Sequence, residues 1–277
     1  MEKRILFLDL DGTLLDDEKH ISPGNRAALE RALRAGHRVV ITTGRALSSA
    51  KTQAGQLGLD GPGCYIIAFN GAVIYDCGAE RVIDSLPLDM DAFFAVVDEC
   101  NRRGVFVQTY EGEDVAVEPQ NDNDTVRRYC SISRMRYRVV ADLCRDLREA
   151  PPKALIADFD RRAPLEEMQQ WIRDNLSDKI DCFFSSPYYL EVVRKGLNKG
   201  QAVIELCRRL DVPISNAIAV GDEANDLSMI RSAGIGVAMA NGIDPVKQAA
   251  DYVTERDNNH DGVAEVVERF CFGTEAQ

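Results

Sequence analysis

Short apolar runs alternate with segments of helical periodicity over the first 70 residues of the chain. Residues 5–8, 39–41 and 65–69 are unbroken apolar runs of strand length, which predicts buried strands. Residues 22–36 and 46–57 carry apolar side chains at helical spacing between these runs. Alternating strands and helices are typical of a parallel sheet with helices on its faces.

The pattern changes between residues 85 and 190. Two segments are helix-like, residues 91–103 and 164–176. Strand-like runs occupy residues 105–108, 115–117, 154–157, 182–185 and 188–193. Residues 118–125 are polar, and the Asn-rich residues 120–124 within them are typical of a solvated loop. Strands and helices no longer alternate strictly here, which indicates a separate α+β insert.

The strand–helix alternation returns after residue 195. We expect helices at 199–210 and 262–270, with strands at 217–220, 235–237 and around residue 252. The sequence therefore predicts an α/β fold with a Rossmann-like parallel-sheet core and an inserted α+β domain. In this scheme residues 1–84 and 191–277 form the core, and residues 85–190 form the insert.

Composition narrows the class of protein. Apolar residues make up 45% and charged residues 28% of the 277 residues, as in ordinary soluble enzymes. The formal net charge of −12 argues against nucleic acid or a membrane surface as the main partner. The chain has no long apolar window, and residues 1–4 run directly into a strand, so we expect a cytoplasmic protein. The eight cysteines form no C-x-x-C pair and are expected to be buried.

Two aspartates stand where the first strand should end. Asp9 and Asp11 are two residues apart, so their side chains leave an extended strand on the same side, and Gly12 allows the chain to turn. An Asp-Gly turn is the simplest alternative. A calcium loop is excluded because its sixth position needs glycine and its twelfth glutamate, whereas the twelfth residue here is His20. Two close carboxylates beside an apolar strand favour a hard divalent ion that also holds a phosphate.

Polar residues follow two further predicted strands. Thr43 comes after the second strand, and Asp222, Asn225 and Asp226 come after the strand at 217–220. Ligands bind beyond the carboxyl ends of the strands in open parallel sheets, so these groups are expected to meet near Asp9. Lys199 lies at the start of a helix that can bring its ammonium group to the same place.

These residues carry a resemblance to a known family. The ordered motifs are Asp9-x-Asp11-Gly12-Thr13, Thr43-Gly44-Arg45, Leu197-Asn198-Lys199-Gly200 and Gly221-Asp222-x-x-Asn225-Asp226. Together they resemble the haloacid dehalogenase-like superfamily of phosphohydrolases. Within it the chain looks like the Cof-type branch, whose cap is a large α/β insert between the second and third motifs.

The resemblance implies a role for each motif residue. It implies that Asp9 is a nucleophile that takes the phosphoryl group, and that Asp11 is the general acid and then the general base. It implies Mg²⁺ held by the Asp9 carboxylate, the Asp11 backbone carbonyl and Asp222. The phosphoryl oxygens would be held by Thr43, the amides of Leu10 and Gly44, Arg45 and Lys199. Asn225 and Asp226 would orient the metal ligands or reach the phosphate.

Several of these residues have structural alternatives. Lys199 and Arg45 would be surface cations in an unrelated protein, and Asp226 would only cap the helix that follows it. Asn198 is expected to be a helix N-cap. Thr42 competes with Thr43 for the phosphate contact, and the family pattern favours the residue immediately before the glycine.

The resemblance implies a phosphatase, with the insert selecting the leaving group and acting as a mobile lid. Sugar phosphates are the first expected substrates, followed by phosphorylated cofactors such as pyridoxal phosphate or flavin mononucleotide. A phosphomutase and a catalytically silent phosphometabolite-binding protein are the alternatives. The silent protein is disfavoured because Asp9, Asp11, Lys199 and Asp222 are all present. The sequence predicts neither the oligomeric state nor whether Asn70 and Asn198 touch the substrate.

Overall fold

The structure is a computed structural model that describes residues 2–273, and it divides them into two compact units. One unit holds the described residues up to Asp84 and from Asn198 onward, and the other is Ser85–Leu197. The sequence-based second boundary, after residue 190, lies inside strand β11 (Tyr189–Arg194). This strand pairs with two others of the second unit, so its hydrogen bonds keep it there. None of the described helices combines the length and the apolar character needed to span a membrane.

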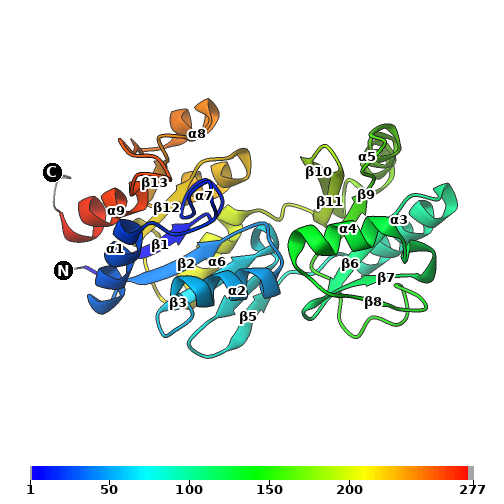
Figure 1. The fold of residues 1–277 in the computed structure, drawn as a ribbon, viewed down its shortest axis with the longest axis horizontal. Coiled ribbons are helices and arrows are strands. Elements are labelled where there is room, and N and C mark those ends of the chain that lie inside the picture. Colours follow the sequence, from blue (N-terminus) through cyan, green and yellow to red (C-terminus); the bar gives the residue numbers. More distant parts are fainter. Residues whose placement is uncertain (1, 274–277) are drawn as a thin grey trace. The chain divides into compact units, whose positions relative to one another are not determined.

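The first unit contains an eight-stranded sheet in the order β14-β13-β12-β1-β2-β3-β4-β5 (Figure 1). Its strands are β1 (Ile5–Leu8), β2 (Arg38–Thr42), β3 (Cys64–Ala68), β4 (Val73–Asp76), β5 (Arg81–Ser85), β12 (Ala217–Gly221), β13 (Ile235–Ala238) and β14 (Tyr252–Val253). The strands from β14 to β3 are parallel, as the sequence predicts, and β4 runs antiparallel to β3. Strands β4 and β5 were not predicted, and β5 is largely exposed, so it lacks an apolar run.

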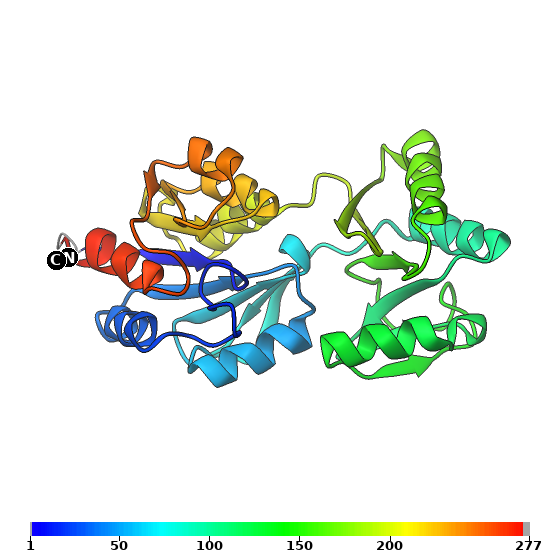
Figure 2. The ribbon, with the colours of Figure 1, turned by 45° about the horizontal axis from the view of Figure 1, so that its top comes forward.

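Helices cover both faces of this sheet. They are α1 (Pro23–Arg34), α2 (Leu47–Leu57), α6 (Lys199–Arg209), α7 (Leu227–Ser232), α8 (Asp244–Ala249) and α9 (Gly262–Val267), with a π-helical turn at Glu268–Phe272. Ile5 and Phe7 of β1 belong to a buried cluster with Val203 of α6 and Met229 of α7. Helices α1 and α9 pack together on the opposite side of the sheet, as Figure 2 shows. Strand β1 is therefore buried on both faces, which explains its unbroken apolar run.

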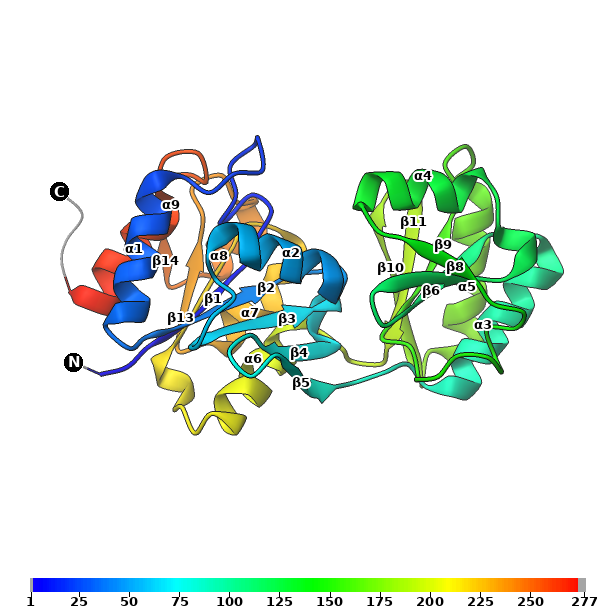
Figure 3. The ribbon, with the colours of Figure 1, turned by 60° about the horizontal axis from the view of Figure 1, so that its bottom comes forward.

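The second unit is an α+β domain built on a six-stranded sheet in the order β10-β11-β9-β6-β7-β8. Its other strands are β6 (Val107–Glu111), β7 (Asp114–Val117), β8 (Tyr137–Val139), β9 (Ala154–Ala157) and β10 (Ile180–Ser186). Helices α3 (Met90–Arg103) and α5 (Ala163–Leu176) bury one face of the sheet. Helix α4 (Asp124–Ser133) lies over the other face, as Figure 3 shows.

The loop predicted at residues 120–124 is partly ordered, because it holds the end of a short 3₁₀ turn and the first residue of α4, a helix that was not predicted. A short 3₁₀ turn at Pro119–Asn121 comes first, and Asn123 then caps α4 by accepting a hydrogen bond from the amide of Thr125 at 2.9 Å. The helix buries only Val126 and Cys130, so its apolar stripe is too narrow to stand out in the sequence.

The core sheet brings three strand ends together. Strand β1 lies between β12 and β2 and is parallel to both, so the carboxyl ends of all three strands lie at one edge. The eight cysteine side chains are mostly buried. Six of the eight are buried and two are half-buried, as expected for small apolar side chains.

Candidate functional site

Asp9 follows β1 directly and is 7% exposed. Its amide donates a hydrogen bond to the carbonyl of Val220 at 3.1 Å, which continues the pairing of β1 with β12. Gly12 then turns the chain with a φ of +82°, and a side chain at this position would collide with the carboxylate of Asp222. The glycine is thus required both by the backbone conformation and by the close approach of a second carboxylate.

Lys199 is fully buried and contacts two carboxylates. Its helix, α6, begins after Asn198, whose side chain accepts a hydrogen bond from the amide of Gln201 at 3.0 Å, so the expected N-cap is present. The Nζ atom of Lys199 lies 2.5 Å from Oδ1 of Asp9 and 2.6 Å from Oδ1 of Asp226. Lys199 is therefore not a surface cation, and it links the ends of β1 and β12.

Asp226 performs two structural tasks at once. Its Oδ2 atom accepts hydrogen bonds from the amides of Asp222 and Glu223, both at 3.0 Å, and so caps the short 3₁₀ helix that follows β12. Its Oδ1 atom pairs with Lys199, and the residue is fully buried. The expected cap of the helix that follows, α7, is absent, because the Asp226 side chain makes no cap hydrogen bond there. The side chain instead completes the capping box of the 3₁₀ turn Ala224–Asp226, and the ion pair with Lys199 is added to that role.

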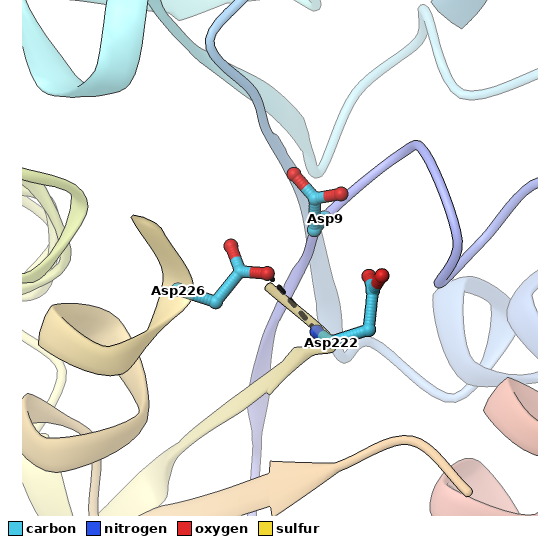
Figure 4. A group of neighbouring side chains, drawn as sticks. All are labelled: Asp9, Asp222 and Asp226. Carbon is cyan, nitrogen blue, oxygen red and sulfur yellow. Dashed lines mark hydrogen bonds between the residues drawn. The ribbon is translucent and has the colours of Figure 1, made fainter. Parts of the chain in front are cut away.

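Asp222 completes a group of three buried aspartates, which Figure 4 shows with Asp9 and Asp226. One carboxylate oxygen from each of the three lies within 4.8 Å of the others. The hydroxyl of Thr13 donates a hydrogen bond to Oδ1 of Asp222 at 2.6 Å and fixes the rotamer of that carboxylate. Thr13, which is itself fully buried, thus joins the loop after β1 to the loop after β12.

Burial makes the charges of this group costly. Burial, together with the nearby Asp226 and Asp222 charges, raises the pKa of Asp9 to about 7 even though Lys199 opposes the shift. Burial and the Asp226 charge raise the pKa of Asp222 to about 6 against the hydrogen bond from Thr13. Burial would lower the pKa of Lys199, but Asp9 and Asp226 outweigh it and raise that pKa. The single positive charge of Lys199 therefore offsets only part of the negative charge of the three carboxylates.

The donor set of this group fits a hard divalent cation. All three side chains offer carboxylate oxygens, the ligands that Mg²⁺ prefers, and a second positive charge would offset the excess of negative charge. Asp226 is the least suited of the three to be a ligand, because its two oxygens already accept hydrogen bonds from Lys199 and two backbone amides. Asp9 and Asp222 are the better candidates.

Asp11 is more exposed than Asp9 and forms its own ion pairs. Arg45 donates to both of its oxygens, from Nε at 2.9 Å and from Nη2 at 2.7 Å, and Lys19 donates at 2.9 Å. Burial would raise the pKa of Asp11, but the two cations outweigh it and lower that pKa. Asp11 is therefore held ionised by Arg45, although its side chain is 40% exposed.

The end of β2 contributes Thr43, Gly44 and Arg45. Thr43 is buried, and its hydroxyl accepts a hydrogen bond from the amide of Arg45 at 3.2 Å. The carbonyl of Thr43 accepts from the amide of Asn70, whose own side-chain carbonyl accepts from Asn225 at 3.3 Å. The structure thus brings Asn70 beside the strand ends, where a side chain on Gly44 would touch it.

Some residues of this edge were not singled out from the sequence. Lys19 reaches Asp11 from the loop after β1, and Asn241 donates a hydrogen bond to the carbonyl of Gly12 at 2.7 Å. Thr13 lies within the first motif but had no assigned role. No local pattern marks these residues, because their partners are set by how the strands pair and not by sequence spacing. The side chain of Leu10 is fully buried, so only its backbone can serve the site.

Comparison with known proteins gives a family match over nearly the whole chain. The model of a family described as haloacid dehalogenase-like hydrolase matches residues 6–267. A solved structure, a haloacid dehalogenase-like hydrolase from Bacteroides thetaiotaomicron, superposes with a TM-score of 0.87 at 32% identity and covers 97% of this chain and 99% of its own.

Two curated relatives carry named activities. The 5-amino-6-(5-phospho-D-ribitylamino)uracil phosphatase YitU of Bacillus subtilis is 32% identical over 96% of this chain and 97% of its own length. The pyridoxal phosphate phosphatase YbhA of Escherichia coli is 28% identical over 96% of this chain and 98% of its own. Both matches extend across the two units.

Proposed function

Because the chain belongs to the haloacid dehalogenase-like hydrolase family and is a phosphatase of its Cof-type branch, we propose a specific mechanism for it. It hydrolyses small phosphorylated metabolites with Mg²⁺, through a phosphoryl group carried on Asp9. The observation that carries this proposal is the buried ion-pair chain from Asp9 through Lys199 to Asp226, at the carboxyl ends of β1 and β12.

Asp9 is the nucleophile of the proposed reaction. One of its carboxylate oxygens bonds to phosphorus while the bond from phosphorus to the ester oxygen breaks. The leaving oxygen takes a proton from Asp11. A water molecule then attacks the aspartyl phosphate, Asp11 accepts the proton of that water, and Asp9 is released with inorganic phosphate.

Lys199 is assigned two tasks. Its ammonium group fixes one oxygen of Asp9 and leaves the other to face the phosphorus, and it offsets charge as the phosphoryl group approaches. Asp226 holds the lysine in place from the opposite side. Thr43, Asn225 and the amides of Leu10 and Gly44 are proposed to donate hydrogen bonds to the phosphoryl oxygens.

Mg²⁺ is proposed to be held by the carboxylates of Asp9 and Asp222 and by the backbone carbonyl of Asp11. When bound, it supplies positive charge to the phosphoryl oxygens, so that two anions approach without repulsion. Thr13 keeps Asp222 turned toward Asp9 through its 2.6 Å hydrogen bond, which prepares the ligand set.

The ion pair between Asp11 and Arg45 has to open before Asp11 can act as an acid. Arg45 stabilises the charged form of Asp11, whereas an acid must carry a proton. We assign Arg45 to the phosphoryl group once the substrate is bound, because a guanidinium group pairs with phosphate oxygens as well as with a carboxylate. Arrival of the phosphate would then release Asp11 for proton transfer.

The insert is proposed to select the leaving group and to contribute nothing to phosphoryl transfer. Every residue assigned to that chemistry belongs to the first unit. The two relatives are named as phosphatases of 5-amino-6-(5-phospho-D-ribitylamino)uracil and of pyridoxal phosphate, which supports small phosphorylated metabolites, including the phosphorylated cofactors expected from the sequence, as the substrate class.

The test is phosphate release from a panel of phosphorylated metabolites, with and without Mg²⁺, by wild type and Asp9→Asn. Asn is isosteric and lacks the nucleophilic charge, so the variant should fold normally and lose turnover by more than about a hundredfold. Turnover within about tenfold of wild type, under 1.4 kcal/mol of barrier, would refute Asp9 as nucleophile. A phosphomutase would instead interconvert isomers of a sugar phosphate and release no phosphate.

A further inference from the structure

The loop after β1 supplies the backbone carbonyl that we assign to Mg²⁺, that of Asp11, and the carbonyls around it are held by hydrogen bonds. The carbonyls of Asp9 and Leu10 accept from amides within the same loop, at 3.2 and 2.8 Å. The carbonyl of Gly12 instead accepts from Nδ2 of Asn241 at 2.7 Å, from a residue 229 positions away. The carbonyl of Asp11 therefore lies between neighbours whose orientation is fixed.

Asn241 belongs to a turn after β13 that is bonded to the backbone of Asp222. The amide of Ile243 donates a hydrogen bond to the carbonyl of Asp222 at 3.0 Å, and the amide of Gly242 closes the turn by donating to the carbonyl of Met239 at 2.8 Å. A side chain on Gly242 would lie 3.3 Å from the Cα atom and from the carbonyl oxygen of Asp222. The turn that carries Asn241 thus packs directly against a proposed metal ligand.

These contacts close a ring between the two loops that carry the proposed metal ligands. Thr13 joins the loops once, because its hydroxyl donates to Oδ1 of Asp222 at 2.6 Å. Asn241 joins them a second time, through the carbonyl of Gly12 on one side and through its own turn on the other. One hydrogen bond leaves two loops free to pivot about it, whereas two bonds at separate points restrain their spacing. Thr13 and Asn241 together therefore fix how far apart the two loops lie.

The side chain of Asn241 is exposed, yet both of its polar atoms are used. Its Oδ1 atom accepts a hydrogen bond from the amide of Asn258 at 3.1 Å, while Nδ2 donates to Gly12. The reverse orientation of the amide group would set oxygen against a carbonyl and nitrogen against an amide, so only one orientation satisfies both neighbours. Asn258 is 3% exposed and donates from its own side chain to the carbonyl of Leu15 at 3.0 Å. The two asparagines thus hold the loop after β1 at two points.

We propose that Asn241 is a positioning residue for the metal site, which holds the loop after β1 so that the carbonyl of Asp11 and the carboxylate of Asp222 face Mg²⁺ together. This rests on the proposed function, which places Mg²⁺ at these two groups, and it adds a residue that acts only through its neighbours. Residues that orient metal ligands typically change metal affinity by about 10–100-fold. The effect of Asn241 should therefore appear in the affinity for Mg²⁺.

The test is calorimetric titration of the full-length, metal-free protein with Mg²⁺ alone. Asn241→Ala should weaken Mg²⁺ binding by about tenfold. Asn241→Leu, which keeps the shape of the side chain and lacks both polar atoms, should weaken it equally. Asn259→Ala is the matched control, because Asn259 is an exposed asparagine that holds the same loop through Asp17, by bonds of 3.1 and 3.3 Å, and lies outside the ring. Its Mg²⁺ affinity should equal that of wild type.

Thr13→Val, close in shape to threonine but without the hydroxyl, tests the ring itself. If Thr13 and Asn241 act through one ring, breaking it at either point has most of the effect, so the double variant should lose less affinity than the product of the two single losses. Independent, multiplicative losses would overturn the ring.

Thermal melting of each variant checks that it folds. A change in Mg²⁺ affinity of less than about twofold in both Asn241 variants, or an equal loss in Asn259→Ala, contradicts the positioning role. If wild type itself binds no Mg²⁺, the proposed metal site fails together with this inference. Normal Mg²⁺ binding by wild type and by both Asn241 variants contradicts this inference alone.

Discussion

The ammonium of Lys199 lies 2.5 Å from the carboxylate of Asp9, although the two residues are 190 positions apart in the chain. The contact is fully buried on the lysine side and 11% exposed on the side of the aspartate. It exists because α6 begins beside the carboxyl end of β1, and it opposes the rise in the pKa of Asp9 that burial causes.

Lys199→Met should destabilise the fold as well as stop turnover. The change leaves Asp9 and Asp226 buried and unpaired, and breaking a buried pair in this way typically costs about 3–5 kcal/mol. Urea denaturation of the metal-free protein measures the loss. Lys195→Met removes an exposed pair with Asp181 and should cost less than about 1 kcal/mol. Equal losses in the two variants would show that the Lys199 pairs do not stabilise the fold.

Asp11→Asn should slow hydrolysis according to the leaving group. Loss of a general acid costs about 10²–10⁴-fold when the leaving oxygen needs a proton, as for an alkyl phosphate. An activated aryl phosphate leaves without help and should be affected far less. Steady-state rates on one ester of each kind give the comparison, and an equal loss on both would remove Asp11 from the role of acid.

Asp222→Ala should raise the Mg²⁺ concentration needed for half-maximal activity, by about 10–100-fold if Asp222 is a ligand. Titration of activity with Mg²⁺ after treatment with chelator is the measurement. Asp244→Ala removes an exposed carboxylate of α8 and should leave the Mg²⁺ requirement as it is. An unchanged requirement in Asp222→Ala would assign the ligand elsewhere.

His37 should make the protein less stable as the pH falls below about 6.5. Burial, followed by the charges of Lys3 and Arg4, lowers the pKa of His37 from 6.5. The unfolded chain therefore binds a proton that the folded protein resists, so the stability contributed by neutral His37 is present above pH 6.5 and lost below it. The Nδ1 atom of His37 accepts a hydrogen bond from the amide of Arg4 at 2.9 Å.

His37→Asn is the matching variant, because its side-chain oxygen can accept that amide and does not titrate. Urea midpoints at pH 7.5, 6.5 and 5.5 should fall less steeply with pH in the variant than in wild type. Parallel pH profiles would show that His37 does not contribute.

Much of the core fold could be predicted because its strands are buried on both faces. Strand β1 was predicted with its observed bounds, Ile5–Leu8, and β12 was predicted to within one residue. Helix α1 was marked by Ser22, whose side chain accepts from the amide of Asn25 at 3.2 Å. Elements with little buried surface, such as α4 and β5, carry no such signal and were not predicted.

The sequence predicted which strand ends form the site, but it predicted few of the contacts between the side chains there. Asp9, Lys199 and Asp222 were expected to meet because parallel strands end at one edge, and the structure places them there. The ion pair between Arg45 and Asp11 could not be predicted, since it depends on rotamers chosen by long side chains after folding. The same holds for the hydrogen bond from Thr13 to Asp222.

The position of β1 in the core sheet also determines when the core sheet can be completed during synthesis. Ile5 pairs with Arg38 on one side and with Ala217 on the other, so one edge of β1 stays unpaired until β12 is made, after the whole second unit. At about 5–20 residues per second this wait is about 10–40 s. The second unit ends at Leu197 and has its own complete sheet, so it is synthesised in full during that time. A released chain that ends before Ala217 should therefore hold a folded insert and an unfinished core with an open, apolar strand edge, a state that attracts chaperones.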